Sequence, residues 1–281
     1  MLDAYLARIG LDQRPDPTPA GLQILQRAHR LAIGFENFDV MLGRPIPLGL
    51  PAVWAKLGGR RGGYCFEHNA LFGAILDELG LPNRPLLARV WLGLQRPAEP
   101  AIIPPLTHTL RLVTIGAETW LADAGFGGSY VPPLPLVDGS TAETPDGAVH
   151  RLMRCGEATQ AHGAWLLERL GPASATDGRA TAIGVWAPQY SFNLSEVAPV
   201  DLELSNWWTS TRPGTRFTSG CLASAVLPDG FAALSGCELS LHTGGAASKR
   251  HLATAGEWRE ALGDIFAIDL KLDEIARLGL F

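Results

Sequence analysis

The chain has 281 residues, which at roughly 150 residues per domain suggests about two domains and is long enough for a sizeable buried core. Its 47% apolar and 18% charged residues are ordinary for a globular protein and exclude a disordered or fibrous chain. The net charge of -5 is small, and the 23 Lys and Arg residues are scattered along the sequence, so we expect no nucleic-acid partner.

The N-terminal segment predicts no targeting signal. Asp3, Arg8 and Asp12 interrupt its apolar residues, and no apolar run in the chain reaches the roughly 18 residues that a membrane span needs. We therefore expect a cytoplasmic protein without a membrane partner. The four cysteines, at positions 65, 155, 221 and 237, are too few and too widely spaced for a disulfide scaffold, so free thiols are expected.

Residues 1–83 predict a mainly helical domain. A short amphipathic helix is expected over 2–9, and a second over 19–33 with Thr18 as N-cap and Pro19 in the first turn. A third helix is expected over 65–79, after the GRRGGY turn, because its apolar residues recur at helical spacing before Gly80.

Residues 84–192 predict antiparallel strands that form a small barrel or a curled sheet. The strands are expected over 85–94, 107–115, 119–128, 182–187 and 190–194, with a Pro-rich loop over 96–106. Residues 193–281 mix strands, expected over 216–227, 231–236 and 238–243, with helices over 256–266 and 273–279. Together these elements predict an α+β fold.

Cys65 is the candidate nucleophile, because it stands where the Gly62-Gly63-Tyr64 turn meets a helix start. Unpaired backbone N–H groups and the helix dipole at such a position favour a thiolate and lower the pKa of a thiol well below about 8.5. The alternative is a buried structural cysteine in the first turn of the helix.

A predicted hairpin supplies a base and a carboxylate. If Gly116 and Ala117 form a two-residue turn, residues whose numbers sum to 233 lie opposite one another. His108 then faces Gly125, and Asp123 lies on the same face within roughly 7 to 8 Å. A four-residue loop would keep this face, whereas a three-residue loop with a bulge would not. Cys65, His108 and Asp123 therefore form a candidate catalytic triad.

Two other uses of these residues are less well supported. Cys65 and His68 have helical i, i+3 spacing, but no second short-spaced pair completes a zinc site, so no metal is expected. The glycines in GFGG at 125–128 lack the lysine and the helix of a phosphate-binding loop and are equally explained as a strand end.

Three segments closely resemble the arylamine N-acetyltransferases: GRRGGYCFEHN at 59–69, THTLRLV at 107–113 and LADAGFGG at 121–128. GFENFDV at 34–40 and NWWTSTRPGTRF at 206–217 are similar to two further segments of that family, so the resemblance spans nearly the whole chain. Gly34 replaces the usual proline and Phe38 a common leucine, and we expect both to reshape the floor near the cleft.

The resemblance implies a three-part fold with a cysteine-protease-like core. Its parts are an N-terminal helical domain (1–83), a central antiparallel β-barrel (84–192) and a C-terminal α/β lid (193–281), with Cys65 at the base of a cleft between them. It also implies acetyl-CoA as co-substrate, an arylamine or arylhydrazine as acceptor, and a ping-pong mechanism through acetyl-Cys65. His108 and Asp123 match the other two catalytic residues of the family.

The resemblance gives further site residues. Phe126, Phe217 and Thr107 are expected to contact the acceptor, and a second set is expected where coenzyme A passes: Gly127, Thr211 and Thr215. Arg61 is expected to be a structural ion-pair partner, and the oligomeric state is not predicted.

Two alternative functions remain open. The same order of Cys, His and Asp occurs in papain-like and transglutaminase-like enzymes, which would act as amide hydrolases without a thioester donor. A non-catalytic binding module would carry a Cys65 that iodoacetamide modifies no faster than an ordinary thiol.

Overall fold

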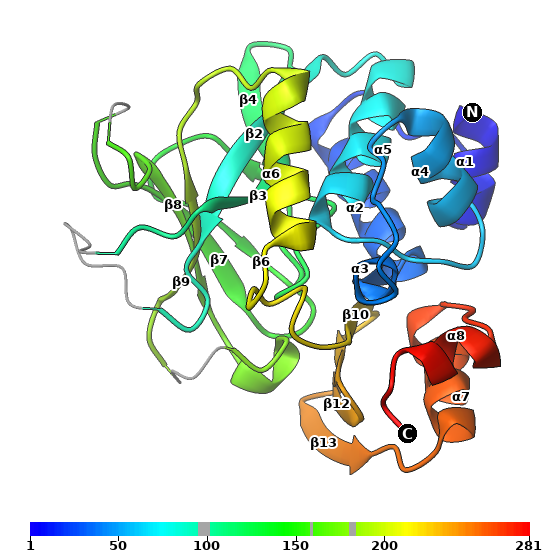
Figure 1. Ribbon diagram of the computed structural model, residues 1–281. Helices are drawn as coiled ribbons and strands as arrows, with labels where there is room; N and C mark the ends of the chain where they lie inside the picture. Colours follow the sequence, from blue (N-terminus) through cyan, green and yellow to red (C-terminus); the bar gives the residue numbers. More distant parts are fainter. Residues whose placement is uncertain (95–101, 158–159, 180–183) are drawn as a thin grey trace.

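The computed structural model describes residues 1–281 except 95–101, 158–159 and 180–183. Helices from the first third of the chain lie beside a curled sheet, and a second sheet with the last two helices lies below them in Figure 1. These segregated helices and antiparallel strands confirm the predicted α+β class. In the described part of the chain, no helix has both the length and the apolar character to cross a membrane.

The N-terminal third is helical, as predicted. Its helices are α1 (Leu2–Arg8), α2 (Pro19–Ala32), α3 (Phe38–Met41), α4 (Leu50–Leu57) and α5 (Cys65–Glu78). The sequence analysis predicts α1, α2 and α5 to within one residue and does not predict the shorter α3 and α4. The side chain of Thr18 accepts a hydrogen bond from the backbone N–H of Gly21 at 3.2 Å, which confirms the predicted N-cap of α2.

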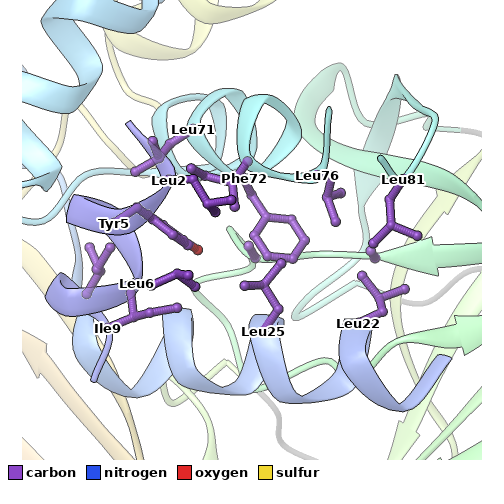
Figure 2. Packing of buried hydrophobic residues seen from close by; sticks show 14 of the residues in the cluster. Leu2, Tyr5, Leu6, Ile9, Leu22, Leu25, Leu71, Phe72, Leu76 and Leu81 are labelled. Atoms are coloured by element: carbon purple, nitrogen blue, oxygen red, sulfur yellow. The ribbon is translucent and has the colours of Figure 1, made fainter. Parts of the chain in front are cut away.

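Helices α1, α2 and α5 share one hydrophobic core (Figure 2). Leu6 of α1, Leu25 of α2 and Phe72 of α5 meet there, and each such side chain contributes about 1.5–3 kcal/mol when fully buried. Val113 and Ala122, from the neighbouring sheet, belong to the same core. The helix that carries Cys65 is therefore fixed to the strands that carry the other candidate catalytic residues.

The larger sheet is a nearly closed antiparallel barrel, as predicted. In spatial order its strands are β5 (Leu134–Pro135), β4 (Glu118–Ala122), β3 (Leu106–Ile115), β2 (Asn83–Val90), β9 (Ala187–Phe192), β8 (Trp165–Leu170), β7 (Val149–Arg154) and β6 (Ser140–Glu143). The two end strands, β5 and β6, follow one another in the chain, so the sheet curls back on itself. A 3-10 turn, η1 (Ala173–Ala175), follows β8.

The smaller sheet joins the two ends of the chain. It consists of β1 (Phe35–Glu36), β10 (Leu222–Leu227), β11 (Gly230–Ser235), β12 (Glu238–Thr243) and β13 (Ala246–His251). Helices α7 (Ala255–Phe266) and α8 (Leu272–Arg277) contribute to its core. Because β1 comes from the N-terminal third, this sheet ties the C-terminal part to the segment that precedes the GRRGGY turn.

Gly34 and Phe38, the two residues that depart from the family pattern, pack against this C-terminal region. The ring of Phe38 packs 5.2 Å from that of Trp258, inside the core. A Cβ at Gly34 would lie 2.5 Å from the carbonyl oxygen of Phe266, so the close approach of the two backbones requires glycine there. Neither residue lines the cavity described below, and the expectation that both reshape the floor near it stays a prediction.

Helix α6 (Pro199–Thr211) is the longest element that the sequence analysis does not predict. Three apolar residues of α6, Val200, Leu204 and Trp207, are more than 60% exposed. The apolar residues of this helix therefore do not line up on one buried face, and their spacing in the sequence does not reveal the helix. Its start does carry a local signal, because Pro199 opens the helix and the carboxylate of Asp201 accepts from the backbone N–H of Ala198 at 3.2 Å.

Some predicted strands are shorter in the structure. The strand expected over 216–227 begins only at Leu222, because residues 216–220 form turns and bends. The strand expected over 182–187 begins only at Ala187; residues 182–183 lie outside the described residues and 184–186 are not extended in the sheet. Most of the Pro-rich loop expected over 96–106 also lies outside the described residues. β13, whose side chains are all exposed, has no predicted counterpart.

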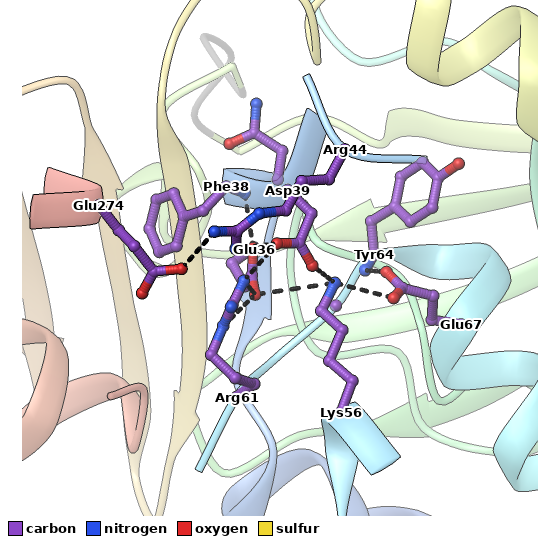
Figure 3. A network of polar contacts seen from close by, with 12 residues as sticks. Glu36, Phe38, Asp39, Arg44, Lys56, Arg61, Tyr64, Glu67 and Glu274 are labelled. Carbon is purple, nitrogen blue, oxygen red and sulfur yellow. Dashed lines mark hydrogen bonds and ion pairs between the residues drawn. The ribbon is translucent and has the colours of Figure 1, made fainter. Parts of the chain in front are cut away.

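A buried network of charges holds α5 against its neighbours (Figure 3). The ammonium of Lys56 lies 2.8 Å from carboxylate oxygens of both Asp39 and Glu67, and Arg61 contacts Glu36 at 2.9 Å and Asp39 at 3.0 Å. Arg61 is thus the ion-pair partner that was expected. Burial alone would raise the pKa of Asp39, but Lys56 and Arg61 hold it at about 2. Because Glu67 also accepts from the N–H of Tyr64 at 3.0 Å, the network fixes the first turn of α5.

Replacing Lys56 by Met should destabilise the protein by about 3–5 kcal/mol, because the variant leaves buried carboxylates without their cation. Urea unfolding measures the change. Arg14→Met is the matched control, since its ion pair with Asp3 has side chains 61% and 82% exposed. The control should change stability by less than about 1 kcal/mol. Similar small effects of both substitutions would contradict the assigned role of the network.

Candidate active site

Cys65 is the first residue of α5. Gly62 and Gly63, just before it, let the backbone pass close to Gly34 and Glu67. A Cβ at Gly62 would lie 2.2 Å from the carbonyl oxygen of Gly34, and a Cβ at Gly63 would lie 2.7 Å from a carboxylate oxygen of Glu67. Glycine is therefore required at Gly62, where the crowding atom is backbone, whereas a side chain at Gly63 would displace the Glu67 carboxylate. Cys65 is 2% exposed and lines a cavity.

The β3–β4 hairpin has the predicted register. Ile115 pairs with Glu118 and Arg111 with Ala122, on either side of a two-residue turn in which Gly116 has the positive φ of 60° that a type II′ turn requires. The paired region ends at Ala122, so the predicted pairing of His108 with Gly125 is not part of the ladder. The chain beyond β4 nevertheless brings Asp123 to His108.

His108 Nε2 lies 2.7 Å from Asp123 Oδ2, and both side chains are buried. The other carboxylate oxygen of Asp123 accepts from the N–H of Gly125 at 3.0 Å and from the amide of Asn69 at 3.3 Å. Burial alone would raise the pKa of Asp123, but His108 and these donors hold it below its ordinary value. The carboxylate therefore stays ionised and orients the imidazole ring.

The sequence analysis misses two residues that support Asp123. Asn69 stands one turn after Cys65 on α5, within the CFEHN segment, and that spacing places both on the same helix face. Gln26 of α2 accepts from the backbone N–H of Asp123 at 2.8 Å. No local pattern marks Gln26, because its partner lies 97 residues away.

Burial raises the pKa of the Cys65 thiol, and the carboxylates of Asp123 and Glu67 raise it further, although backbone N–H groups of Thr109 and Phe66 oppose them. The thiol donates to the carbonyl oxygen of Thr107 at 3.6 Å. Burial therefore opposes the lowering of this pKa that is expected from the helix start. A thiolate at this position needs a neighbouring cation.

The cavity has a volume of about 350 Å³ and mostly apolar walls. It brings together Cys65, His108 and most of the other predicted site residues, namely Thr107, Phe126, Gly127, Thr215 and Phe217. Thr211 is not among its lining residues; its hydroxyl donates to the carbonyl oxygen of Trp207 at 2.6 Å within α6. Asp123 lies behind His108 and does not line the cavity either.

Aromatic rings surround the imidazole. The His108 ring is 5.2 Å from that of Phe126 and 5.0 Å from that of Tyr190, measured between centroids. Phe35, which lines the cavity, lies 6.0 Å from the ring of Phe217. Such walls suit a flat aromatic ligand. The sequence analysis does not identify Phe35 or Tyr190 as site residues.

The ring of His68 is held by partners within the protein. Both of its ring nitrogens make hydrogen bonds within the protein, to His29 and to two backbone carbonyls. Within the described ranges, no group of three or more His, Cys, Asp or Glu side chains is placed to hold a metal ion.

A buried thiol and an imidazole that share one cavity, with a carboxylate behind the imidazole, can transfer an acyl group through a thioester. A family model described as N-acetyltransferase matches residues 20–275. The arylamine N-acetyltransferase of Mycolicibacterium smegmatis is 36% identical over 275 residues, which cover 96% of this chain and 92% of that protein.

Solved structures agree with the sequence comparison. The arylamine N-acetyltransferase from Salmonella typhimurium has a TM-score of 0.86 at 32% identity and covers 100% of this chain and 98% of its own. That of Mycobacterium marinum in complex with CoA has a TM-score of 0.82 at 34% identity, covering 99% and 98%. The chain belongs to the arylamine N-acetyltransferase family.

Gly125→Ala tests the close packing of the site, because the new Cβ would lie 2.8 Å from the Cα of Cys65 and 2.5 Å from the amide nitrogen of Asn69. We expect the rate of Cys65 alkylation by iodoacetamide to change at least about tenfold, since Cys65 and the His108–Asp123 pair must separate. Gly263→Ala in α7 is the control: no atom lies within 4 Å of its Cβ, and it should leave the rate unchanged. Equal alkylation rates in both variants would contradict the packing argument.

Proposed function

We propose that this protein catalyses the acetyl-CoA-dependent N-acetylation of arylamines and arylhydrazines through an acetyl-Cys65 intermediate. The observation that carries the proposal is the 2.7 Å bond between His108 and a buried Asp123, at a cavity that the Cys65 thiol also lines. Family membership and the CoA complex of the Mycobacterium marinum relative support the choice of acetyl donor.

In the first half of the reaction, His108 removes the proton from Cys65 Sγ and the resulting thiolate attacks the thioester carbonyl carbon of acetyl-CoA. A new sulfur–carbon bond forms, the bond to the CoA sulfur breaks, and His108 returns its proton to the departing thiolate. Because Asp123 accepts from Nε2–H of His108, the lone pair on Nδ1 is the one available to act as base. The imidazolium that forms is the cation that a buried thiolate requires.

In the second half, the amine nitrogen attacks the acetyl carbon of acetyl-Cys65. His108 accepts the proton that the nitrogen loses and then returns it to the Cys65 sulfur as the carbon–sulfur bond breaks. We propose that Phe126, Phe217 and Thr107 contact the acceptor ring and that Gly127 and Thr215 flank CoA. The contact of Thr211 with CoA, the division at residues 83 and 192, and the cytoplasmic location stay predictions from sequence.

The direct test incubates the protein with acetyl-CoA alone and measures its intact mass. We expect one acetyl adduct on the native protein and none on Cys65→Ser, because only a thiol at this position forms the intermediate. Subsequent addition of an arylamine should remove the adduct. No adduct on the native protein would reject the proposal, and amide cleavage without any thioester would favour a hydrolase.

Asp123→Asn should lower kcat by about 10³–10⁴-fold while the protein stays folded, because the amide no longer fixes the tautomer of His108. Steady-state assay of CoA release with a saturating arylamine measures the effect. Asp12→Asn, which changes an exposed acid in the same way, is the control and should retain native kcat. A native-like kcat for Asp123→Asn would remove the carboxylate from the mechanism.

A further inference from the structure

Three buried polar side chains form a hydrogen-bonded chain behind the candidate nucleophile. The hydroxyl of Tyr5 lies 2.7 Å from Nδ1 of His29, and Nε2 of His29 lies 2.7 Å from Nδ1 of His68. Nε2 of His68 in turn lies 3.1 Å from the carbonyl oxygen of Gly63 and 3.2 Å from that of Gly34. Tyr5, His29 and His68 are fully buried.

Only one arrangement of protons satisfies every group in this chain. A carbonyl oxygen only accepts, so Nε2 of His68 carries a hydrogen and donates. Burial lowers the pKa of His29 and of His68 well below the ordinary value, so both rings are neutral and carry a single N–H. Nδ1 of His68 therefore accepts from Nε2–H of His29, and Nδ1 of His29 accepts from the hydroxyl of Tyr5. The donors point from Tyr5 toward Gly63.

His68, the last side chain of this hydrogen-bonded series, holds together two backbone segments near the start of α5. Gly63 immediately precedes Tyr64 and Cys65, and its carbonyl also accepts from the N–H of Glu36 at 2.8 Å. The N–H of Gly63 donates to the carbonyl oxygen of Gly34 at 3.3 Å. The ring Nε2–H of His68 thus bridges the carbonyl oxygens of Gly34 and Gly63, which lie on two segments joined by a parallel β-bridge.

His68 also supports a wall of the cavity. Its ring lies parallel to that of Phe35, with centroids 6.2 Å apart and an angle of 9° between the planes. Phe35 lines the cavity together with Cys65. One imidazole therefore contacts both the turn that precedes Cys65 and a ring that lines the cavity.

We propose that Tyr5, His29 and His68 form a directional positioning relay that fixes the Gly63–Tyr64–Cys65 turn for acyl transfer. None of the three touches the reacting atoms, so they are positioning residues. The inference rests on the proposed role of Cys65 as nucleophile.

The proton arrangement can be measured in the native protein. Nitrogen-15 NMR of the imidazole rings at neutral pH should show both His29 and His68 as neutral Nε2–H tautomers. An Nδ1–H tautomer or an imidazolium at either residue would overturn the relay. In Tyr5→Phe, which loses only the first donor, the nitrogen shifts of His68 should move, and unchanged shifts would contradict a connected chain.

The positioning role is tested by the rate at which iodoacetamide alkylates Cys65. His68→Leu should slow alkylation at least about tenfold, and kcat of acetyl transfer should fall with it. His68→Gln, whose amide can both donate to the carbonyls and accept from His29, should restore the rate to within about threefold of native. A native rate in folded His68→Leu, or an equal loss in both variants, would overturn the proposal.

His150→Leu is the matched control, because His150 is equally buried but lies in β7, with no hydrogen-bond partner for its ring nitrogens among the described residues. It should leave alkylation at the native rate. The experiments also separate this inference from the proposed function: an acetyl adduct on Cys65 with native-like His68 variants rejects only the relay, whereas no adduct on the native protein rejects the enzyme mechanism.

Discussion

Backbone crowding at the start of α5 is the constraint on which the site depends. A side chain at Gly62 would strike the carbonyl of Gly34, and one at Gly125 would strike the backbone of Cys65. Glycine at these positions lets β1, the first turn of α5 and the chain after β4 meet without intervening side chains. Cys65, from the helical part, consequently shares a cavity with His108 from the barrel.

Charges and polar bonds stabilise that arrangement together with the apolar core that α5 shares with the barrel strands. Glu67 caps α5 and is neutralised by Lys56, while Asn69 of the same helix reaches Asp123. Every one of these groups is largely removed from water, so each depends on its partner. The same desolvation raises the pKa of the Cys65 thiol, so the proposed mechanism assigns its activation to the imidazole of His108.

The sequence predicts the parts of this structure that local patterns determine. Helical periodicity and the Thr18 cap give α2, and a two-residue turn at Gly116 gives the register of the β3–β4 hairpin. The chain that continues from this hairpin beyond Ala122 brings Asp123 to His108. Long-range partners leave no such pattern. Gln26 contacts Asp123 across 97 residues, and α6 exposes its apolar residues, so neither follows from spacing. The motif also does not show the burial that raises the pKa of the Cys65 thiol.

The central claim is that His108 supplies the cation that lets a buried Cys65 ionise. The most direct measurement is the pH dependence of Cys65 alkylation in the native protein and in His108→Gln. If the claim holds, the native thiol reacts near neutral pH as an ion pair, whereas the variant reacts only under alkaline conditions because burial raises its pKa and no imidazolium is present to offset the rise. Coincident pH profiles would contradict the account.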